Sequence, residues 1–429
     1  MIRRQILKGV CALLIVISGA MSYGEGIYAG LAKVEITPPI GGETTGYSSA
    51  KPTVGIHDPL YARVLILKSS ETTLAIVSWD LCIFNSPWLH EQLPELGIDK
   101  LLILNTHTHA GPNLNQDDFP SREKPWRKTI DERVLEAIRE AKENMFRAYF
   151  AVEQGSIQLG YNRLVLQPDG YAVTHFENPE RIPYGPVDPT VGVIRITDEH
   201  GQPRCIMVCY ACHPVVLGPR NRMISADYPG VLYREVENEL GEDVQCMFIQ
   251  GGAGDINPLI LARTGDPESD FPLVESMGKL LAEEVLRTID IMGDQKGKSE
   301  FLCYKSDVIQ AGNRWEPEQT VPLEVNSVLI NQEIGFVTMP GEPFHRFQVE
   351  LRNKSDLPHT FLFGYCGNFT YDWPRYLPDL ESAARGGYGA SDTTLVEVGA
   401  GERMINQGLV MLYEMRGRLL DKPQRHLKD

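Results

Sequence analysis

Short apolar segments that end in a polar residue beside a turn recur along this chain, and this pattern most constrains how it can fold. Apolar runs bounded by glycine or proline are typical of buried strands. Because open sheets place their ligands at the carboxyl ends of strands, we expect several of these ends to meet in one pocket. The polar residues at the expected strand ends are Asp80, His107 with His109, His213, Asp255 and Glu342.

The most informative of these ends lies in residues 101–112, LLILNTHTHAGP. The four apolar residues predict a buried strand, and Gly111-Pro112 predicts the turn that ends it. In an extended chain, residues i and i+2 lie on the same face, so His107 and His109 are expected to project together. Such a pair can bind a metal, with the second histidine as a ligand or an acid/base. Two hydrogen-bonded structural histidines fit the pair equally well.

The other periodic segments predict a mixed α/β fold. Strands are expected over residues 31–36, 61–67, 74–79, 101–104, 191–196, 205–211, 244–249 and 336–339. Helices are expected over residues 131–146, 230–240, 273–289, 344–353 and 404–420, with Asp227 capping the second. Because strands and helices interleave, we expect mixed β-sheets flanked by helices. No internal repeat or linker-like stretch interrupts residues 25–429, which are therefore expected to form a single domain.

The first residues and the overall charge predict an exported protein. Residues 1–24 have a basic start, an apolar run too short to span a bilayer and small residues after it, as a signal peptide does. No later apolar run is long enough to span a bilayer, so we expect a periplasmic or extracellular protein without a membrane anchor. The net charge of −16 excludes nucleic acid as a partner. The oligomeric state is left open.

The cysteines indicate core packing and not a disulfide framework. Removing the leader takes Cys11 of the eight cysteines and leaves an odd number spread over a long chain. Cys205, Cys209 and Cys212 lie in the apolar run CIMVCYAC. At strand spacing the first two share a face and the third points to the other face. This arrangement favours buried core cysteines over a metal cluster.

At these motifs the chain resembles the neutral (non-lysosomal) ceramidase family, zinc-dependent amidases that cleave N-acylsphingosine. Residues 106–112, THTHAGP, resemble the family's Thr-His-Thr-His-Ser-Gly-Pro motif. His213, with NR and ISAD downstream, is similar to the family's second zinc-histidine segment. The segment 340–342, PGE, resembles the one that supplies its carboxylate ligand. The resemblance runs along nearly the whole chain after residue 24.

Three further matches concern the rest of the site. Tyr376 and Tyr388 have the spacing of the family's two site tyrosines, Asn162-Arg163 resembles its Asn-Arg, and Gly46-Tyr47 resembles its early Gly-Tyr turn. The resemblance implies a role for each of the matching residues. The implied zinc ligands are His107, His213, Glu342 and Tyr376; His109 is the implied acid/base, Arg163 and Tyr388 stabilise the oxyanion, Asp255 and Asn257 support the ligands or contact the substrate, and Gly46 lies in the substrate-binding turn. A buried structural tyrosine fits Tyr376 as well.

Two features depart from the family. Its Gly-Asp-Val-Ser-Pro motif is here GDINP, so Asn257 stands at the position of the family's site serine. The resemblance also leads us to expect that the additional carboxyl-terminal sandwich domain of full ceramidases is absent. Attack by water that zinc activates does not need the serine, and an amide can still hydrogen-bond to a ligand or substrate.

Three functions therefore stay open. The first is a secreted zinc hydrolase of a lipid C–N amide bond, with N-acylsphingosine as the family's substrate. The second is the same metal site acting on a sugar-derived amide, ester or lactone. The third is a non-catalytic binding protein. An apolar pocket wall would favour the first, and a polar or acidic wall the second. The remaining histidines, among them His345, lack supporting context and are given no role.

Overall fold

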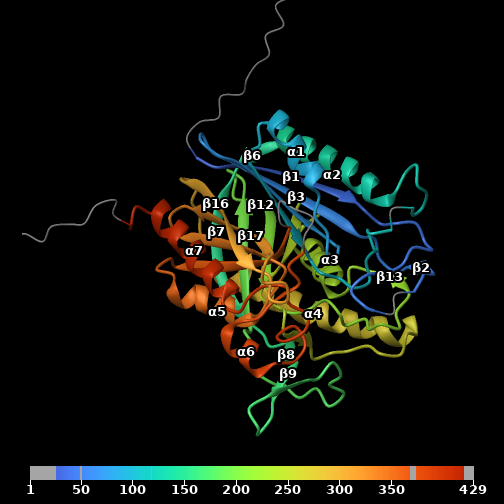
Figure 1. Ribbon diagram of the computed structural model, residues 1–429. Helices are drawn as coiled ribbons and strands as arrows, with labels where there is room; N and C mark the ends of the chain where they lie inside the picture. Colours follow the sequence, from blue (N-terminus) through green and yellow to red (C-terminus); the bar gives the residue numbers. More distant parts are fainter. Residues whose placement is uncertain (1–25, 49–50, 117, 368–372, 420–429) are drawn as a thin grey trace, which may run out of the picture.

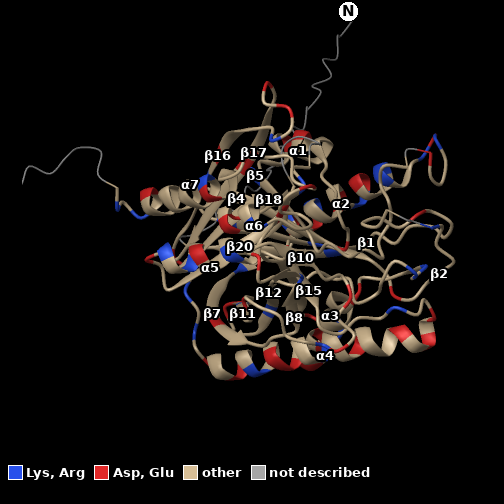
Figure 2. Cartoon of the chain, turned by 60° about the horizontal axis from the view of Figure 1, so that its bottom comes forward, with Lys and Arg blue, Asp and Glu red and all other residues tan. Residues whose placement is uncertain are grey.

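The computed structural model describes residues 26–48, 51–116, 118–367 and 373–419 (Figure 1). The expected leader, residues 1–24, lies outside the described residues. The described chain forms mixed sheets flanked by helices, which confirms the predicted fold class. None of the described helices is long and apolar enough to cross a bilayer. Acidic and basic residues are interspersed along the helices (Figure 2).

The largest sheet takes strands from nearly the whole described chain. Its strands are β1 (Tyr28–Glu35), β3 (Tyr61–Lys68), β4 (Thr73–Trp79), β5 (Lys100–Asn105), β6 (Met145–Arg147), β16 (Leu302–Gly312), β17 (Thr320–Ile330), β18 (Ile334–Pro340) and β20 (His359–Cys366). Their order across the sheet is β16-β17-β18-β20-β5-β4-β3-β1-β6. Two neighbouring pairs are parallel, β4 with β5 and β18 with β20, and the other neighbours are antiparallel.

A second sheet has four strands in the order β14-β12-β11-β7. Its strands are β7 (Tyr149–Ser156), β11 (Thr190–Thr197), β12 (Pro203–Tyr210) and β14 (Gln245–Gln250), of which β12 and β14 are parallel. One apolar core joins the two sheets face to face, with Leu102 and Phe336 of the large sheet packed in the same cluster as Ile194 and Met247 of the small one.

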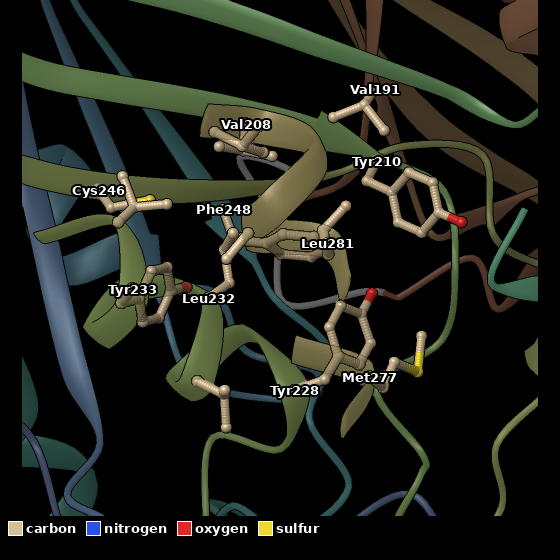
Figure 3. Packing of buried hydrophobic residues seen from close by; sticks show 14 of the residues in the cluster. Val191, Val208, Tyr210, Tyr228, Leu232, Tyr233, Cys246, Phe248, Met277 and Leu281 are labelled. Atoms are coloured by element: carbon tan, nitrogen blue, oxygen red, sulfur yellow. The ribbon is translucent and has the colours of Figure 1, made fainter. Parts of the chain in front are cut away.

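Helices cover the outer face of each sheet, which gives four layers in the order helix, sheet, sheet, helix. α2 (Trp126–Glu143) packs on β1 and β3, while α5 (His345–Lys354) and α7 (Ala400–Met415) pack on the β17–β18 side. α3 (Tyr228–Leu240) and α4 (Pro267–Met292) cover the four-stranded sheet. Figure 3 shows this contact, with Phe248 of β14 beside Leu232 of α3 and Leu281 of α4. Two short helices, α1 (Pro87–Gln92) and α6 (Leu380–Arg385), lie in connections.

Very short paired strands bring distant segments together. These strands are β2 (Gly55–Ile56) with β13 (Met223–Ile224), β8 (Gly160–Asn162) with β15 (Ile256–Pro258), β9 (Leu164–Leu166) with β10 (Ala172–Thr174), and β19 (Glu342–Pro343) with β21 (Tyr376–Leu377). The β8–β15 and β19–β21 pairs join segments in which the sequence predicts site residues. The hairpin formed by β9 and β10 extends away from the body at the bottom of Figure 1.

The structure differs from the sequence-based expectations mainly at element ends and in the last third. α2 begins at Trp126 and not at residue 131, and Trp126 packs against the core from this first turn. α7 spans Ala400–Met415 and stops before the expected residue 420. Strands β16, β17 and β20 were not expected. The cysteine prediction is confirmed: Cys205 and Cys209 are free and packed between the sheets, and Cys212 is free in the core beneath α3 and α4.

Candidate metal centre

His107 enters the site from the loop that follows β5. The strand ends at Asn105 and His107 has a φ of 71°, so the two histidines do not alternate along an extended strand as expected. A positive φ is strained for histidine, and it is held here by the His107 N–H, which donates to Leu81 O at 2.9 Å. The loop still brings the two rings together, with His109 Nε2 3.2 Å from His107 Nε2.

Three of the four expected metal ligands converge. Glu342 Oε2 lies 3.3 Å from His107 Nε2 and 3.1 Å from His213 Nε2, and all three side chains are buried. The ligand atoms of this set lie within 4.8 Å of one another. The other ring nitrogens lie against carbonyl oxygens, His107 Nδ1 at 2.7 Å from Cys82 O and His213 Nδ1 at 3.1 Å from Ile256 O. Because a carbonyl only accepts, each Nδ1 carries the proton and each Nε2 offers its lone pair to the site.

The charges of this cluster also fit a bound cation. Burial by itself raises the pKa of Glu342, but His107 and His213 hold it well below its ordinary value. Burial lowers the pKa of His213 to about 4. Burial also lowers the pKa of His107, while the Cys82 sulfur and the Glu342 carboxylate raise it well above its ordinary value. A bound metal ion would compete with protons for these ligand atoms.

Tyr376, the fourth expected ligand, lies beside Glu342. β19 and β21 pair in parallel with Glu342 opposite Tyr376, and Glu342 N donates to Arg375 O at 2.9 Å. The Tyr376 ring centre lies 5.3 Å from that of Tyr388. The guanidinium carbon of Arg163 lies 5.3 Å from the first ring centre and 5.2 Å from the second. The structure thus gathers the expected arginine and both expected tyrosines next to the expected metal ligands.

Asn257 holds Arg163 in this position. Arg163 donates from one terminal nitrogen to Asn257 Oδ1 at 3.1 Å and from the other to Gly254 O at 2.6 Å. Both residues are buried. The amide that stands at the family's serine position therefore acts as an acceptor that orients the guanidinium group.

Asp255 lies in a second buried cluster and not among the three converging ligands. Its Oδ2 lies 2.6 Å from His345 Nδ1 and accepts from Asn162 Nδ2 at 2.8 Å, and its Oδ1 accepts from His345 N at 2.9 Å. Burial raises the pKa of Asp255, but the His345 imidazolium outweighs burial and lowers it. This cluster links β8, β15 and the start of α5.

His109 is enclosed between the metal ligands and the Gly46-Tyr47 turn. Its ring centre lies 4.7 Å from that of Tyr47. Gly46 has a φ of 94°, and a Cβ atom there would lie 2.4 Å from the His109 ring, so this turn requires glycine. Burial and then the two neighbouring histidines lower the pKa of His109 well below its ordinary value. The imidazole is therefore neutral and able to accept a proton.

Two other residues singled out from the sequence have partners elsewhere. Asp80 was expected in the common pocket, but its carboxylate pairs with Arg63 at 3.2 Å and accepts from the Tyr233 hydroxyl at 3.2 Å. Asp227 precedes α3 and accepts from Tyr228 N at 2.7 Å, which confirms the expected cap. Asp80 thus supports the fold around β3 and β4.

Three residues that the sequence reading did not assign lie at or beside the site. Cys82 supplies the carbonyl that orients His107, and His345 pairs with Asp255. The ring centre of Tyr365 lies 4.5 Å from that of His107. His345 follows the carboxylate segment closely and could have been noticed for that reason. No sequence signal distinguishes Cys82 or Tyr365.

The layers and the buried histidine–carboxylate group define a mixed α/β protein with a candidate metal centre. A family model described as neutral/alkaline non-lysosomal ceramidase, N-terminal, matches residues 28–271. Neutral ceramidase A of Dictyostelium discoideum is 30% identical over 350 residues, which are 70% of this chain and 47% of that protein. The chain belongs to the neutral/alkaline non-lysosomal ceramidase family, and it spans about half the length of this relative.

Two solved structures share the fold. A ceramidase complexed with C2 superposes with a TM-score of 0.74 and 17% identity, over 93% of this chain and 77% of that one. Neutral ceramidase from Pseudomonas aeruginosa superposes with a TM-score of 0.73 and 16% identity, over 93% and 76%. At these identities the likeness concerns the fold, which is the one that the sequence resemblance implied.

Proposed function

We propose that this protein is a zinc-dependent hydrolase that cleaves the C–N amide bond of a lipid amide, as ceramidases cleave N-acylsphingosine. One observation carries the proposal: in a member of the ceramidase family, the ligand atoms of His107, His213 and Glu342 lie within 4.8 Å of one another. Two imidazoles and a carboxylate are the protein ligands of many catalytic zinc sites, and Tyr376 would be the fourth. Zinc bound there would activate water and polarise the carbonyl group.

His109 is the proposed acid/base of this reaction. Its Nε2 lies 3.2 Å from that of His107, and its lowered pKa keeps it neutral and ready to accept a proton from the attacking water. The same nitrogen would then return the proton to the leaving amine. The Gly46 turn fixes the ring from the other side, and we assign its backbone a contact with the substrate.

Arg163 and Tyr388 are the proposed stabilisers of the developing oxyanion. A guanidinium group and a phenol can both donate to an oxygen that gains negative charge. Asn257 positions the guanidinium group through its hydrogen bond at 3.1 Å. Asp255 acts indirectly. It accepts a hydrogen bond from Asn162, which directly precedes Arg163, and it pairs with His345.

The hairpin formed by β9 and β10 supports a lipid substrate. Exposed apolar side chains are concentrated on it: Leu166, Tyr171, Val173 and Phe176. The ring of Phe176 lies 5.1 Å from that of Tyr388, so this apolar surface reaches the proposed oxyanion site. Exposed apolar side chains next to a site favour an apolar partner, and here Phe176 adjoins the proposed oxyanion group.

A second candidate substrate class has a different observation in its favour. A cavity of about 230 Å³ adjoins Asn162 and His345, and its wall combines the charged Arg346, Asp379 and Arg385 with apolar side chains such as Leu164 and Leu166. Such a wall, together with Asn257 at the serine position, would suit a sugar-derived amide, ester or lactone. A non-catalytic binding protein is the least supported function, because the candidate ligands and the acid/base lie together.

The setting of this reaction is also proposed. The leader-like residues 1–24 support export to the periplasm or the extracellular space. Residues 25–429 are proposed to form one domain, since the nine-stranded sheet takes strands from both ends of the described chain.

The test is hydrolysis by the purified, zinc-loaded protein. A fluorescent short-acyl ceramide would be offered beside a panel of sugar amides, esters and lactones, with His107→Ala and the exposed His200→Ala as a matched pair. Turnover of the ceramide by the parent and His200→Ala, lost in His107→Ala, supports the lipid-amide function. Turnover of the sugar compounds alone supports the second candidate. No turnover of any compound by protein that holds zinc contradicts both.

A further inference from the structure

Tyr365 lies at the end of β20 with its ring against the proposed zinc-binding histidines. Its ring centre is 4.5 Å from that of His107 and 6.0 Å from that of His213, and the side chain is fully buried. The backbone has a φ of 54°, which is strained for tyrosine. Tyr365 N donates to Gly341 O at 3.1 Å, and Tyr365 O accepts from Asn105 Nδ2 at 2.9 Å. These bonds hold the ring in place despite the strain.

The hydroxyl group of Tyr365 has no hydrogen-bond partner among the described residues. Other buried tyrosines show the usual arrangement. The Tyr210 hydroxyl donates to Ile157 O at 3.0 Å and accepts from Leu159 N at 3.0 Å. A buried, unpaired hydroxyl costs stability, so a side chain that carries one inside a site calls for a functional reason.

The neighbours of this hydroxyl indicate that reason. The Tyr365 ring lies 4.5 Å from that of His107, whose Nε2 lies 3.3 Å from Glu342 Oε2. A phenol is protonated at neutral pH and can donate. A donor packed against the proposed ligands is close to the place where a substrate carbonyl would be polarised.

We propose that Tyr365 is a further catalytic residue, whose hydroxyl donates a hydrogen bond to the substrate carbonyl oxygen beside Arg163 and Tyr388. The inference rests on the proposed amide hydrolysis. The phenol keeps its proton throughout: the carbonyl carbon gains the water oxygen and loses the leaving nitrogen, and His109 carries the proton from that water to that nitrogen. The hydrogen bond strengthens as the oxygen gains negative charge, and its loss therefore lowers kcat more than it changes KM.

Tyr365→Phe tests this role because it keeps the ring and removes only the hydroxyl. With the fluorescent short-acyl ceramide, kcat should fall about 100-fold and KM should change by less than about threefold. Zinc content and zinc affinity, measured by competition with a chelating dye, should equal those of the parent. The Tm should be equal or higher, because the hydroxyl has no partner to lose.

Tyr233→Phe is the matched control, since it removes a buried hydroxyl that donates to Asp80 Oδ1 at 3.2 Å, in the Asp80–Arg63 pair outside the proposed site. Its Tm should fall while kcat stays at the parent value. If Tyr365→Phe keeps the kcat of the parent, this inference is overturned and the proposed function is not. The same holds if Tyr365→Phe binds zinc more weakly, which would make Tyr365 a metal ligand. A parent that hydrolyses no amide overturns both the function and this inference.

Discussion

Two buried clusters in this protein each join a carboxylate to histidine, and they differ in what satisfies the carboxylate. Glu342 Oε2 faces the Nε2 atoms of His107 and His213 at 3.3 and 3.1 Å, and both nitrogens are acceptors when the rings are neutral. Asp255 instead receives the Nδ1–H and backbone N–H of His345 and the amide of Asn162. The Asp255 cluster is complete without a cation, whereas the Glu342 cluster presents several lone pairs to one point.

The difference lies in which ring nitrogen is already occupied. In the Glu342 cluster, each Nδ1 is bound to a backbone carbonyl, and this leaves Nε2 to a metal. In the Asp255 cluster, Nδ1 of His345 is bound to the carboxylate itself. The backbone around a histidine thus separates a proposed metal ligand from a structural ion pair, although the sequence presents both as an acid and an imidazole near strand ends.

The largest expected effect comes from breaking the Glu342 cluster. His107→Ala should lower kcat/KM more than about 1000-fold, because a catalytic metal that loses a protein ligand binds weakly or in the wrong geometry. Metal analysis should find much less zinc per chain than in the parent. The exposed His200→Ala should match the parent in both measurements. Full zinc content in His107→Ala would show that this histidine is not a ligand.

Breaking the Asp255 cluster should affect folding and leave the metal in place. Asp255→Asn leaves His345 buried without its carboxylate, which should lower the free energy of unfolding by about 3 kcal/mol. Urea denaturation of the metal-free protein measures this loss, and zinc content should equal that of the parent. Exposed Asp294→Asn is the control, with no change expected. Loss of zinc together with unchanged stability would reverse the assignment of the two clusters.

The boundary of the Glu342 cluster can be tested at Gly46. An alanine Cβ there would meet the His109 ring at 2.4 Å and displace the proposed acid/base, so kcat should fall about 100-fold while zinc content stays unchanged. Gly41→Ala is a matched control, because Gly41 also has a positive φ of 105° but no atom within 4 Å of an added Cβ. Equal losses in the two variants would attribute the effect to backbone strain and not to His109.

The fold was predictable where burial leaves a periodic signal. β3, β4, β5, β12 and β14 are apolar along most of their length, and they were expected close to their true bounds. β16 was missed because it lies at the sheet edge and is largely exposed, so its apolar content is low. The first turn of α2 was also missed, because Trp126 is its one apolar residue and is followed by Arg127 and Lys128.

The site was predictable in its members but not in its geometry. Strand-end position and family resemblance selected His107, His213 and Glu342, which the structure brings together. The reason given for His107 and His109 was wrong, because a left-handed turn and not strand alternation joins them. The ring of Tyr365 contacts His107, which lies far away in sequence, and a single chain read in order contains no record of such a contact.

The smallest expected effect is the pH dependence of the Asp255–His345 pair. Burial lowers the pKa of His345, but Asp255 outweighs burial and raises it above 6.5, so its stabilisation is complete below that value and is lost as the pH rises through the folded pKa. His345→Gln should therefore lower the free energy of unfolding of the metal-free protein more at about pH 5.5 than at about pH 9. His359→Gln should lower the free energy of unfolding less at about pH 5.5 than at about pH 9. Burial lowers the pKa of His359, so its protonation in acid destabilises the parent. Equal losses for His345→Gln at both pH values would mean that the pair is not ionised, and the Asp255 cluster would then be held by its hydrogen bonds alone.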